Sequence, residues 1–292
     1  MHEALLESRP SRHQIAADFE ASELAGGICV LYSSACPGRA TANEDCAAII
    51  RCGERTAVLA VADGVGGMRG GDLASRAALT ALKEAILHSS KKKSDSLRSS
   101  ILNGIDAANK TVLELGVGAA STLAIVEIQG RTIRPYHVGD SMILNVGQRG
   151  KIKLQTISHS PVGFAVEAGL LDPKEAMYHA QRHIVSNVIG SADMRIEIGP
   201  TLTLSPRDTL VLASDGLSDN LHQSEIIESI RKGPLETGVR QMAEKSRRRM
   251  ISTTPGVPSK PDDLTIIAYR PTQPPKEKAP ARRKTRRASG AA

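Results

Sequence analysis

The sequence has few aromatic residues and no tryptophan. Aromatic side chains make up 2% of its 292 residues, while 40% of the residues are hydrophobic. A core must therefore be built from Ala, Val, Ile and Leu, and few rings are available to stack on nucleic-acid bases. No apolar run approaches the roughly 18–20 residues that a membrane-spanning helix needs. The length allows one large domain or two small ones.

Signals for secretion and for disulfide bonding are also lacking. The N-terminus, Met1 to Arg12, has no basic start followed by an apolar stretch, so no secretory signal is visible. The four cysteines lie close together without CxxC spacing: Cys29, Cys36, Cys46 and Cys52. Disulfide frameworks are typical of small secreted chains, so we expect reduced, structural cysteines and a cytoplasmic protein. A zinc site would need ligands at a better spacing.

The net charge of +7 is concentrated at the C-terminal end. Residues 271–292 hold seven Lys or Arg against one Glu, and thus +6 of the total. The nearly neutral remainder disfavours a nucleic-acid-binding protein. Composition predicts that this tail is disordered, and its Arg286-Arg287-Ala288-Ser289 end is of the kind that basophilic kinases phosphorylate. We interpret the tail either as a solubilising end or as a weak contact for nucleic acid or an anionic surface.

Hydrophobic periodicity predicts a mixed α+β protein. An apolar, β-branched run at 56–62 leads into a glycine-rich stretch, and helical spacing follows over 73–86 with Asp72 in the position of an N-cap. A second helix is expected from about 97 to 115, and two more within 223–250. Two helices inserted between sets of strands argue against a parallel βαβ repeat.

Short β-type runs separated by turn signals suggest an antiparallel meander in the middle of the chain. The expected strands of this meander cover residues 122–128, 132–138, 142–146 and 152–157. Later strands are expected at 208–213 and 264–269. We divide the chain into an N-terminal extension with a weak helical pattern, a single domain and the basic tail: residues 1–25, 26–270 and 271–292.

Three Asp-bearing turns lie beside apolar β-type runs far apart in the sequence. They contain Asp63-Gly64, Asp215-Gly216 and Asp262-Asp263. Each turn places a carboxylate where a strand ends or begins, and hard divalent cations prefer such oxygen ligands. With no competing His or Cys cluster in the sequence, this pattern predicts a two-metal site for phosphate chemistry. Taken alone, an Asp-Gly pair is more often a type I′ turn.

The order of the motifs points to a family. In sequence order the chain contains Asn43-Glu44-Asp45, Asp63-Gly64-Val65-Gly66-Gly67, Gly118-Ala119-Ala120-Ser121-Thr122, Gly139-Asp140-Ser141, Ser214-Asp215-Gly216-Leu217 and Asp262-Asp263-Leu264-Thr265. Together they resemble the NED, DGxGG, GsT, GDSR, SDGL and DN(I/L)T elements of the PPM/PP2C family of metal-dependent protein serine/threonine phosphatases. The resemblance covers about residues 26–270. It implies a four-layered α/β/β/α sandwich of two antiparallel sheets flanked by helix pairs, with the site at one end of the sheets.

The resemblance also implies roles for individual residues. Asp63 would bridge two Mn²⁺ or Mg²⁺ ions, and the Gly64 carbonyl would bind one of them. Asp215 and Asp262 would complete the shell of the first ion. Glu44 and Asp45 would act near the second ion, partly through water.

Arg39 lies upstream of these two acids, where the family has an Arg that grips the substrate phosphate. Its spacing to Asp45 is one residue longer than usual, and a solvated loop charge is the alternative interpretation. The segment Gly163–Gly190 falls where the family has its flap, and the sequence gives no readable substrate preference for it.

The function implied is hydrolysis of phosphoserine and phosphothreonine in proteins by a water that bridges the two metals, without a covalent phospho-enzyme. Phosphoprotein substrates, a partner protein kinase and a role in signalling follow from it. The main alternative is a catalytically weak phosphatase-like domain with a regulatory or binding role. A second is the related branch that acts on an anti-sigma-factor antagonist.

The chain departs from the family pattern at several positions. Val65 stands where many eukaryotic members have a His that is a candidate general acid, so no side-chain acid is expected there. The Arg of the GDSR element is replaced by Met142. Ser158 stands where bacterial relatives have an Asp that helps to bind a third metal, so a third ion at Asp140 stays open. Asp263 replaces the family's Asn, so that either Asp262 or Asp263 could be the ligand.

The histidines show no metal-ligand spacing and are interpreted as structural or surface residues. They include His137, His159, His179 and His183.

Overall fold

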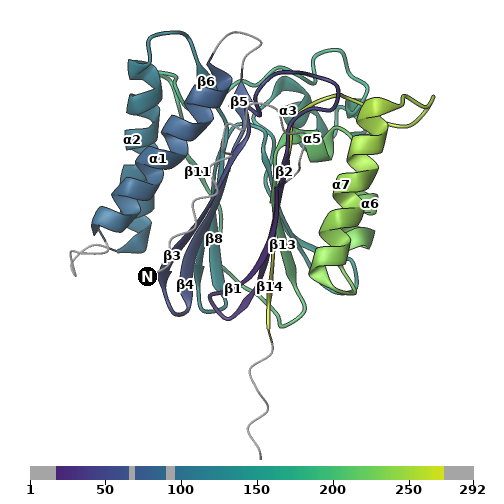
Figure 1. Ribbon diagram of the computed structural model, residues 1–292. Coiled ribbons are helices and arrows are strands. Elements are labelled where there is room, and N and C mark those ends of the chain that lie inside the picture. The colour runs from purple at the N-terminus through teal and green to yellow at the C-terminus, as the bar shows by residue number, and fades with distance from the viewer. Residues whose placement is uncertain (1–17, 66–69, 90–95, 273–292) are drawn as a thin grey trace, which may run out of the picture.

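The computed structural model describes residues 18–65, 70–89 and 96–272. Two antiparallel sheets pack face to face, and a pair of helices covers the outer face of each sheet (Figure 1). The predicted four-layered α/β/β/α sandwich is therefore confirmed. In the described part of the chain, no helix is long and apolar enough to cross a membrane.

The first sheet joins strands from both ends of the domain. Its order is β1 (Asp18–Leu24), β2 (Gly27–Ser34), β14 (Leu264–Pro271), β13 (Thr209–Ala213), β9 (Met142–Val146) and β10 (Ile152–Gln155). The second sheet has the order β11 (Glu197–Ile198), β8 (Thr132–Val138), β7 (Leu123–Gln129), β4 (Thr56–Ala62) and β3 (Cys46–Gly53), and β12 (Leu202–Thr203) also pairs with β8. A small ribbon pairs β5 (Gly64–Val65) with β6 (Ala120–Ser121).

The helices divide between the two outer faces and the end of the sandwich. Helices α1 (Gly71–Ser89) and α2 (Leu97–Glu114) lie beside the second sheet, and α6 (Gln223–Ile230) and α7 (Leu235–Ile251) lie beside the first (Figure 1). The short helices are α3 (Pro161–Glu167), α4 (Pro173–Ala176) and α5 (Asp215–Ser218).

The sequence of strand β4 is continuously apolar because both of its faces are buried. Val58 and Ala60 pack in the core between the second sheet and helices α1 and α2. Their neighbours Leu59 and Val61 pack in the core between the two sheets. Successive side chains of a strand point to opposite faces, so a strand buried on both faces carries no polar alternation. A third core lies between the first sheet and helices α6 and α7.

Most predicted elements are confirmed, and two interpretations are wrong. Strands β8 and β9 have the predicted bounds but belong to different sheets, so the predicted meander is wrong: the chain crosses between sheets at Gly139-Asp140-Ser141. The weak helical pattern near the N-terminus is also wrong over Asp18–Leu24, which is strand β1 paired with β2. This strand begins inside the predicted extension. The proposed three-part division itself stays a prediction, and residues 273–292 of the tail lie outside the described residues.

Two smaller outcomes complete the comparison. The sequence predicts Asp72 as an N-cap, but helix α1 begins at Gly71, so Asp72 is the second residue of its first turn. All four cysteines are reduced thiols rather than disulfide partners, as predicted. Burial raises the pKa of Cys29 to about 12, which fits an unreactive, structural thiol.

Candidate active site

The Asp residues of the predicted site gather at the end of the sandwich that is uppermost in Figure 1, where β5 and α5 lie. Asp63 follows β4, Asp140 lies between β8 and β9, and Asp215 opens α5 directly after β13. Burial, and then the charges of Asp45, Asp215, Asp140 and Asp262, raise the pKa of Asp63 well above its usual range. Like charges raise a carboxyl pKa only at short range. The fold therefore brings these five carboxylates together from distant parts of the sequence.

The backbone of Asp63 is fixed by the Ser121-Thr122 pair. The Asp63 N–H donates to Thr122 Oγ1 over 3.0 Å, and the Asp63 carbonyl accepts from the Thr122 N–H over 2.8 Å. The Ser121 hydroxyl donates to the same carbonyl over 2.9 Å. Thr122 Oγ1 also lies 2.6 Å from the hydroxyl of Ser141. The Gly118–Thr122 element thus ties the turn after β4 to the crossing between the two sheets.

Gly64 has no room for a side chain. A Cβ placed there would lie 2.4 Å from the carbonyl carbon of Gly71. Its N–H donates to the Glu44 carbonyl over 3.2 Å, which draws the Asn43-Glu44-Asp45 segment against the Asp63 turn. Glycine is therefore required here by close backbone packing.

Asp262 and Asp263 have different environments. The two carboxylate oxygens of Asp263 accept the backbone N–H groups of Cys36 and Glu44, each over 2.6 Å. Asp263 therefore holds two backbone segments together and has both oxygens engaged. The side chain of Asp262 is 31% exposed and faces the acidic cluster. This geometry favours Asp262 over Asp263 as the ligand.

Asp45 offers an oxygen that no protein group satisfies. Its side chain is buried, and Oδ2 accepts a 2.7 Å hydrogen bond from Ser214, whereas Oδ1 has no hydrogen-bond partner. Burial, and then the charge of Asp263, raise the pKa of Asp45 well above its usual range. Buried polar atoms are normally paired. An unpaired carboxylate oxygen among other acids has the donor chemistry that a hard divalent cation requires, so the residues present fit such an ion.

Asp140 is half-buried in the same cluster. Burial, followed by the charges of Asp215 and Asp219, raises its pKa to about 7. The Ser158 hydroxyl lies 2.8 Å from that of Ser160, which in turn accepts the Gly163 N–H. Ser160 thus caps α3, and the Ser158 hydroxyl is engaged with this capping residue.

Glu44 and Arg39 lie on another side of the cluster. Burial, and then the charges of Asp263, Asp72 and Asp262, raise the pKa of Glu44, while Arg39 opposes this shift. Arg39 has the same lowering effect on the pKa of Asp263. The positive charge of exposed Arg39 therefore acts on the carboxylates of Glu44 and Asp263. A cavity of about 410 Å³, lined in part by Glu44 and Asp72, opens beside them.

The sequence interpretation missed two residues of the cluster, Asp219 and Lys260. The Lys260 ammonium lies 2.5 Å from Asp215, 2.8 Å from Asp219 and 3.1 Å from Asp262. Asp219 lies one helical turn after Asp215, and this spacing was the available signal because residues four apart share a helix face. No motif signalled Lys260.

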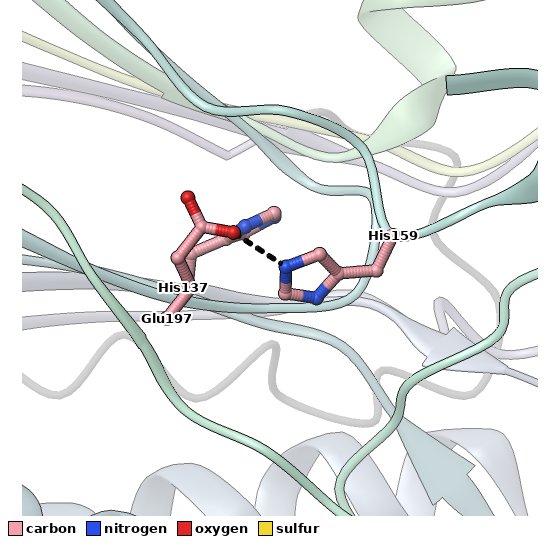
Figure 2. Close-up of side chains that lie close together, drawn as sticks. All are labelled: His137, His159 and Glu197. Atoms are coloured by element: carbon pink, nitrogen blue, oxygen red, sulfur yellow. Dashed lines mark hydrogen bonds and ion pairs between the residues drawn. The ribbon is translucent and has the colours of Figure 1, made fainter. Parts of the chain in front are cut away.

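Two histidines and a glutamate come close together (Figure 2). Donor atoms of His137, His159 and Glu197 lie within 4.8 Å of one another, although the sequence spacing gave no sign of it. His159 Nδ1 lies 3.1 Å from the Gly139 N–H and 2.9 Å from Asn187 Nδ2. It must accept both bonds, because Asn187 Oδ1 accepts the Arg195 N–H and Nδ2 also donates to the Arg195 carbonyl.

This arrangement fixes the tautomer of His159. With Nδ1 unprotonated, Nε2 carries the proton and donates to Glu197 over 2.9 Å. A metal at Nε2 would require loss of that proton, whereas metal-ligating histidines normally donate from their other nitrogen. We therefore interpret His159 as a positioning residue. It holds Gly139, whose φ of +104° and close approach to Thr122 exclude larger residues.

Comparison with known proteins gives one consistent result. The family model described as Protein phosphatase 2C matches residues 36–250. Protein phosphatase PhpP of Streptococcus pneumoniae is 34% identical over 181 residues, which cover 59% of this chain and 71% of PhpP. The serine/threonine phosphatase of S. agalactiae superposes with a TM-score of 0.70 at 28% identity, covering 87% of this chain and 99% of that structure.

A further similar structure is the catalytic domain of serine threonine protein phosphatase PstP in complex with two manganese ions, with a TM-score of 0.66 and 22% identity. It covers 84% of this chain and 98% of that structure, and at this identity it shows the shared fold. The family match extends over most of the chain, and it includes the Asp63 and Asp215 turns. The chain belongs to the protein phosphatase 2C family.

Proposed function

We propose that Asp63, Asp215 and Asp262 hold the two divalent cations, Mn²⁺ or Mg²⁺, with which this protein phosphatase 2C hydrolyses phosphoserine and phosphothreonine in proteins. The observation that carries the proposal is the convergence of carboxylates from five separate segments on one end of the sandwich. So many acids in one place raise one another's pKa and require positive charge close by. Oxygen-only ligands favour hard cations over zinc.

Each group of the chain has a distinct part in this chemistry. Asp63, the Gly64 carbonyl, Asp215 and Asp262 would hold the cations, with Asp45 and Glu44 beside the second. When bound, the cations acidify water and neutralise phosphoryl oxygens. Arg39 would bind the phosphate through its planar guanidinium and orient it. The side chain at position 65 is that of Val, so it supplies no proton to the leaving group.

Supporting residues fix the geometry of these ligands. Ser214 orients Asp45, Thr122 orients the Asp63 turn, and Asp263 holds the backbone of Glu44. Asp140 is available for a third cation, and that assignment stays open. The alternative of a catalytically weak regulatory domain gains no support, because Asp63, Asp215 and Asp262 are all present and gathered.

Further parts of the proposal concern the protein's surroundings. Phosphoproteins are the substrates, a protein kinase is the opposing partner in signalling, and the basic tail at 271–292 is either a solubilising end or a contact for anionic surfaces. The cytoplasmic location expected from the sequence stays a prediction. A substrate-binding role for the flap is supported by a cavity of about 580 Å³, lined in part by Tyr178, Arg182 and Lys260.

Hydrolysis of a phosphothreonine peptide tests the central proposal. We expect turnover with Mn²⁺, none with EDTA, and a loss of more than about a hundredfold in Asp63→Asn, since a lost metal function costs several kcal/mol of transition-state stabilisation. The matched control is Asp193→Asn, which makes the same change at an exposed position. Metal-independent turnover, or equal activity of the two variants, would contradict the two-metal mechanism.

A further inference from the structure

Lys260 places a permanent positive charge among the proposed metal ligands. Its ammonium is within 3.1 Å of oxygens from Asp215, Asp219 and Asp262, and its side chain is only 20% exposed. Two of these three carboxylates are the proposed ligands of the first cation. The ammonium and a divalent cation therefore require the same oxygens.

Hydrogen bonds with Asn220 hold the backbone of Lys260 beside helix α5, which begins at Asp215 and has Asp219 as its C-cap. Asn220, just after α5, accepts the Lys260 N–H over 2.9 Å and donates to the Lys260 carbonyl over 2.8 Å. Asn220 also donates to the Gly216 carbonyl over 3.0 Å within the same turn. The preceding Ser259 donates to the Arg249 carbonyl over 2.7 Å. Only the side chain of Lys260 is free to move relative to the cluster.

The electrostatics of the cluster favour the ammonium at this position. Its positive charge lies within ion-pair distance of all three acids, and the side chains of Asp215 and Asp219 are no more than 18% exposed. Opposite charges attract more strongly where water is largely excluded. Lys260 is therefore an internal counter-charge of these three carboxylates.

We propose that Lys260 is an intramolecular competitor of the divalent cation for Asp215, Asp219 and Asp262, so that metal loading requires its ammonium to leave these carboxylates. The inference rests on the proposed two-metal function. Lys260 also lines a cavity of about 580 Å³ whose lining includes none of these three acids, so its ammonium has space to move into. A cation tethered by the chain is always present at the site, so it lowers the apparent metal affinity at every protein concentration.

Calorimetric titration of metal-free protein with Mn²⁺ measures the competition directly. We expect Lys260→Met to bind Mn²⁺ about tenfold more tightly or better, because a hydrogen bond between charged groups no longer has to be broken. Lys260→Gln, which is neutral but still donates, should gain less. Lys151→Met is the matched control: it removes the same charge at an exposed position and should leave the affinity unchanged.

Thermal unfolding supplies a second measurement that does not depend on turnover. Removing the ammonium leaves three acids without a counter-charge, so metal-free Lys260→Met should melt below the wild type. Saturating Mn²⁺ should then raise the melting temperature of Lys260→Met by more than it raises that of the wild type. If Lys260→Met does not fold without metal, the same comparison of melting temperatures with and without Mn²⁺ can be made on Lys260→Gln.

The possible outcomes separate this inference from the proposed function. Mn²⁺ binding that is equally tight or weaker in both Lys260 variants, with the Asp63→Asn effect intact, would overturn the competition and leave the metal centre standing. No Mn²⁺ binding by the wild type or by either variant would overturn both proposals. Binding that is detectable in Lys260→Met but too weak to measure in the wild type would support the competition in its strongest form.

Discussion

The hydroxyl of Ser214 donates a 2.7 Å hydrogen bond to the carboxylate of Asp45, across 169 positions of sequence. Asp45 precedes β3 of the second sheet, and Ser214 follows β13 of the first. Ser214 Oγ also accepts the N–H of Thr265 over 3.0 Å. One buried hydroxyl thus joins the two sheets beneath the acidic cluster, so the stability of the sandwich end and the geometry of the site are coupled.

Ser214→Ala should therefore weaken both stability and metal binding. Two buried partners lose a hydrogen bond, and we expect unfolding in urea to become easier by about 1–3 kcal/mol. Mn²⁺ affinity should fall as well, because Asp45 loses its orientation. Ser252→Ala, at an exposed position, serves as the control. A Ser214→Ala protein with wild-type stability would show that this hydrogen bond does not hold the sheets together.

Asp262 and Asp263 have different contacts, so substitutions of these two neighbours should have opposite effects on metal binding and on stability. Asp262→Asn should abolish most Mn²⁺ binding, because Asp262 is a proposed ligand. Asp263→Asn should retain Mn²⁺ binding but lose about 1–3 kcal/mol of stability, because an amide has one acceptor oxygen for two backbone N–H groups. Calorimetric titration and urea unfolding of both variants provide the test. The reverse pattern would make Asp263 the ligand.

Much of the site could be predicted because its signals are local. Asp63 and Asp215 each follow a buried apolar strand, and a strand end is readable from neighbouring residues alone. The choice between Asp262 and Asp263 could not be read in this way. It depends on backbone N–H groups of Cys36 and Glu44, more than two hundred positions earlier.

The parts that were missed depend on pairing between distant segments. Strands β8 and β9 follow one another with turn residues between them, as in a hairpin, yet each pairs within a different sheet. Turn chemistry alone cannot distinguish a hairpin from a crossing between layers. Lys260 reaches the cluster because Asn220, 40 positions earlier, fixes its backbone. His137 and His159 meet because His137 lies at the end of β8 beside the crossing between the sheets, and His159 is hydrogen-bonded to Gly139 within it.

The tautomer of His159 predicts that the cluster in Figure 2 does not bind a metal. Glu197 has a side chain that is 46% exposed and accepts from His159 Nε2. Glu197→Gln should therefore leave the number of Mn²⁺ or Zn²⁺ ions bound per chain unchanged, and should cost no more than about 1 kcal/mol of stability. Elemental analysis of dialysed protein measures the stoichiometry. Loss of one bound ion in Glu197→Gln, with Asp193→Asn unchanged, would contradict our interpretation of the tautomer.

Buried His137 predicts an acid-sensitive component of stability. Burial, and then the neighbouring His159, lower the pKa of His137 to about 3, whereas an unfolded chain has its ordinary value near 6.5. Between these values the unfolded state binds the proton more readily, so this stabilisation is complete above pH 6.5 and is lost as the pH falls.

The shifted pKa of His137 also determines how much unfolding free energy is lost in acid. Relative to His137→Gln, the wild type should lose about 2 kcal/mol of unfolding free energy between pH 7 and pH 5. Asp140, with a pKa raised to about 7, acts in the opposite direction because acid stabilises its buried neutral form. That contribution is common to both proteins, so the difference between their urea unfolding curves isolates His137. Exposed His179→Gln should follow the wild type at every pH. Parallel pH profiles of the wild type and His137→Gln would mean that His137 is not held neutral by the fold.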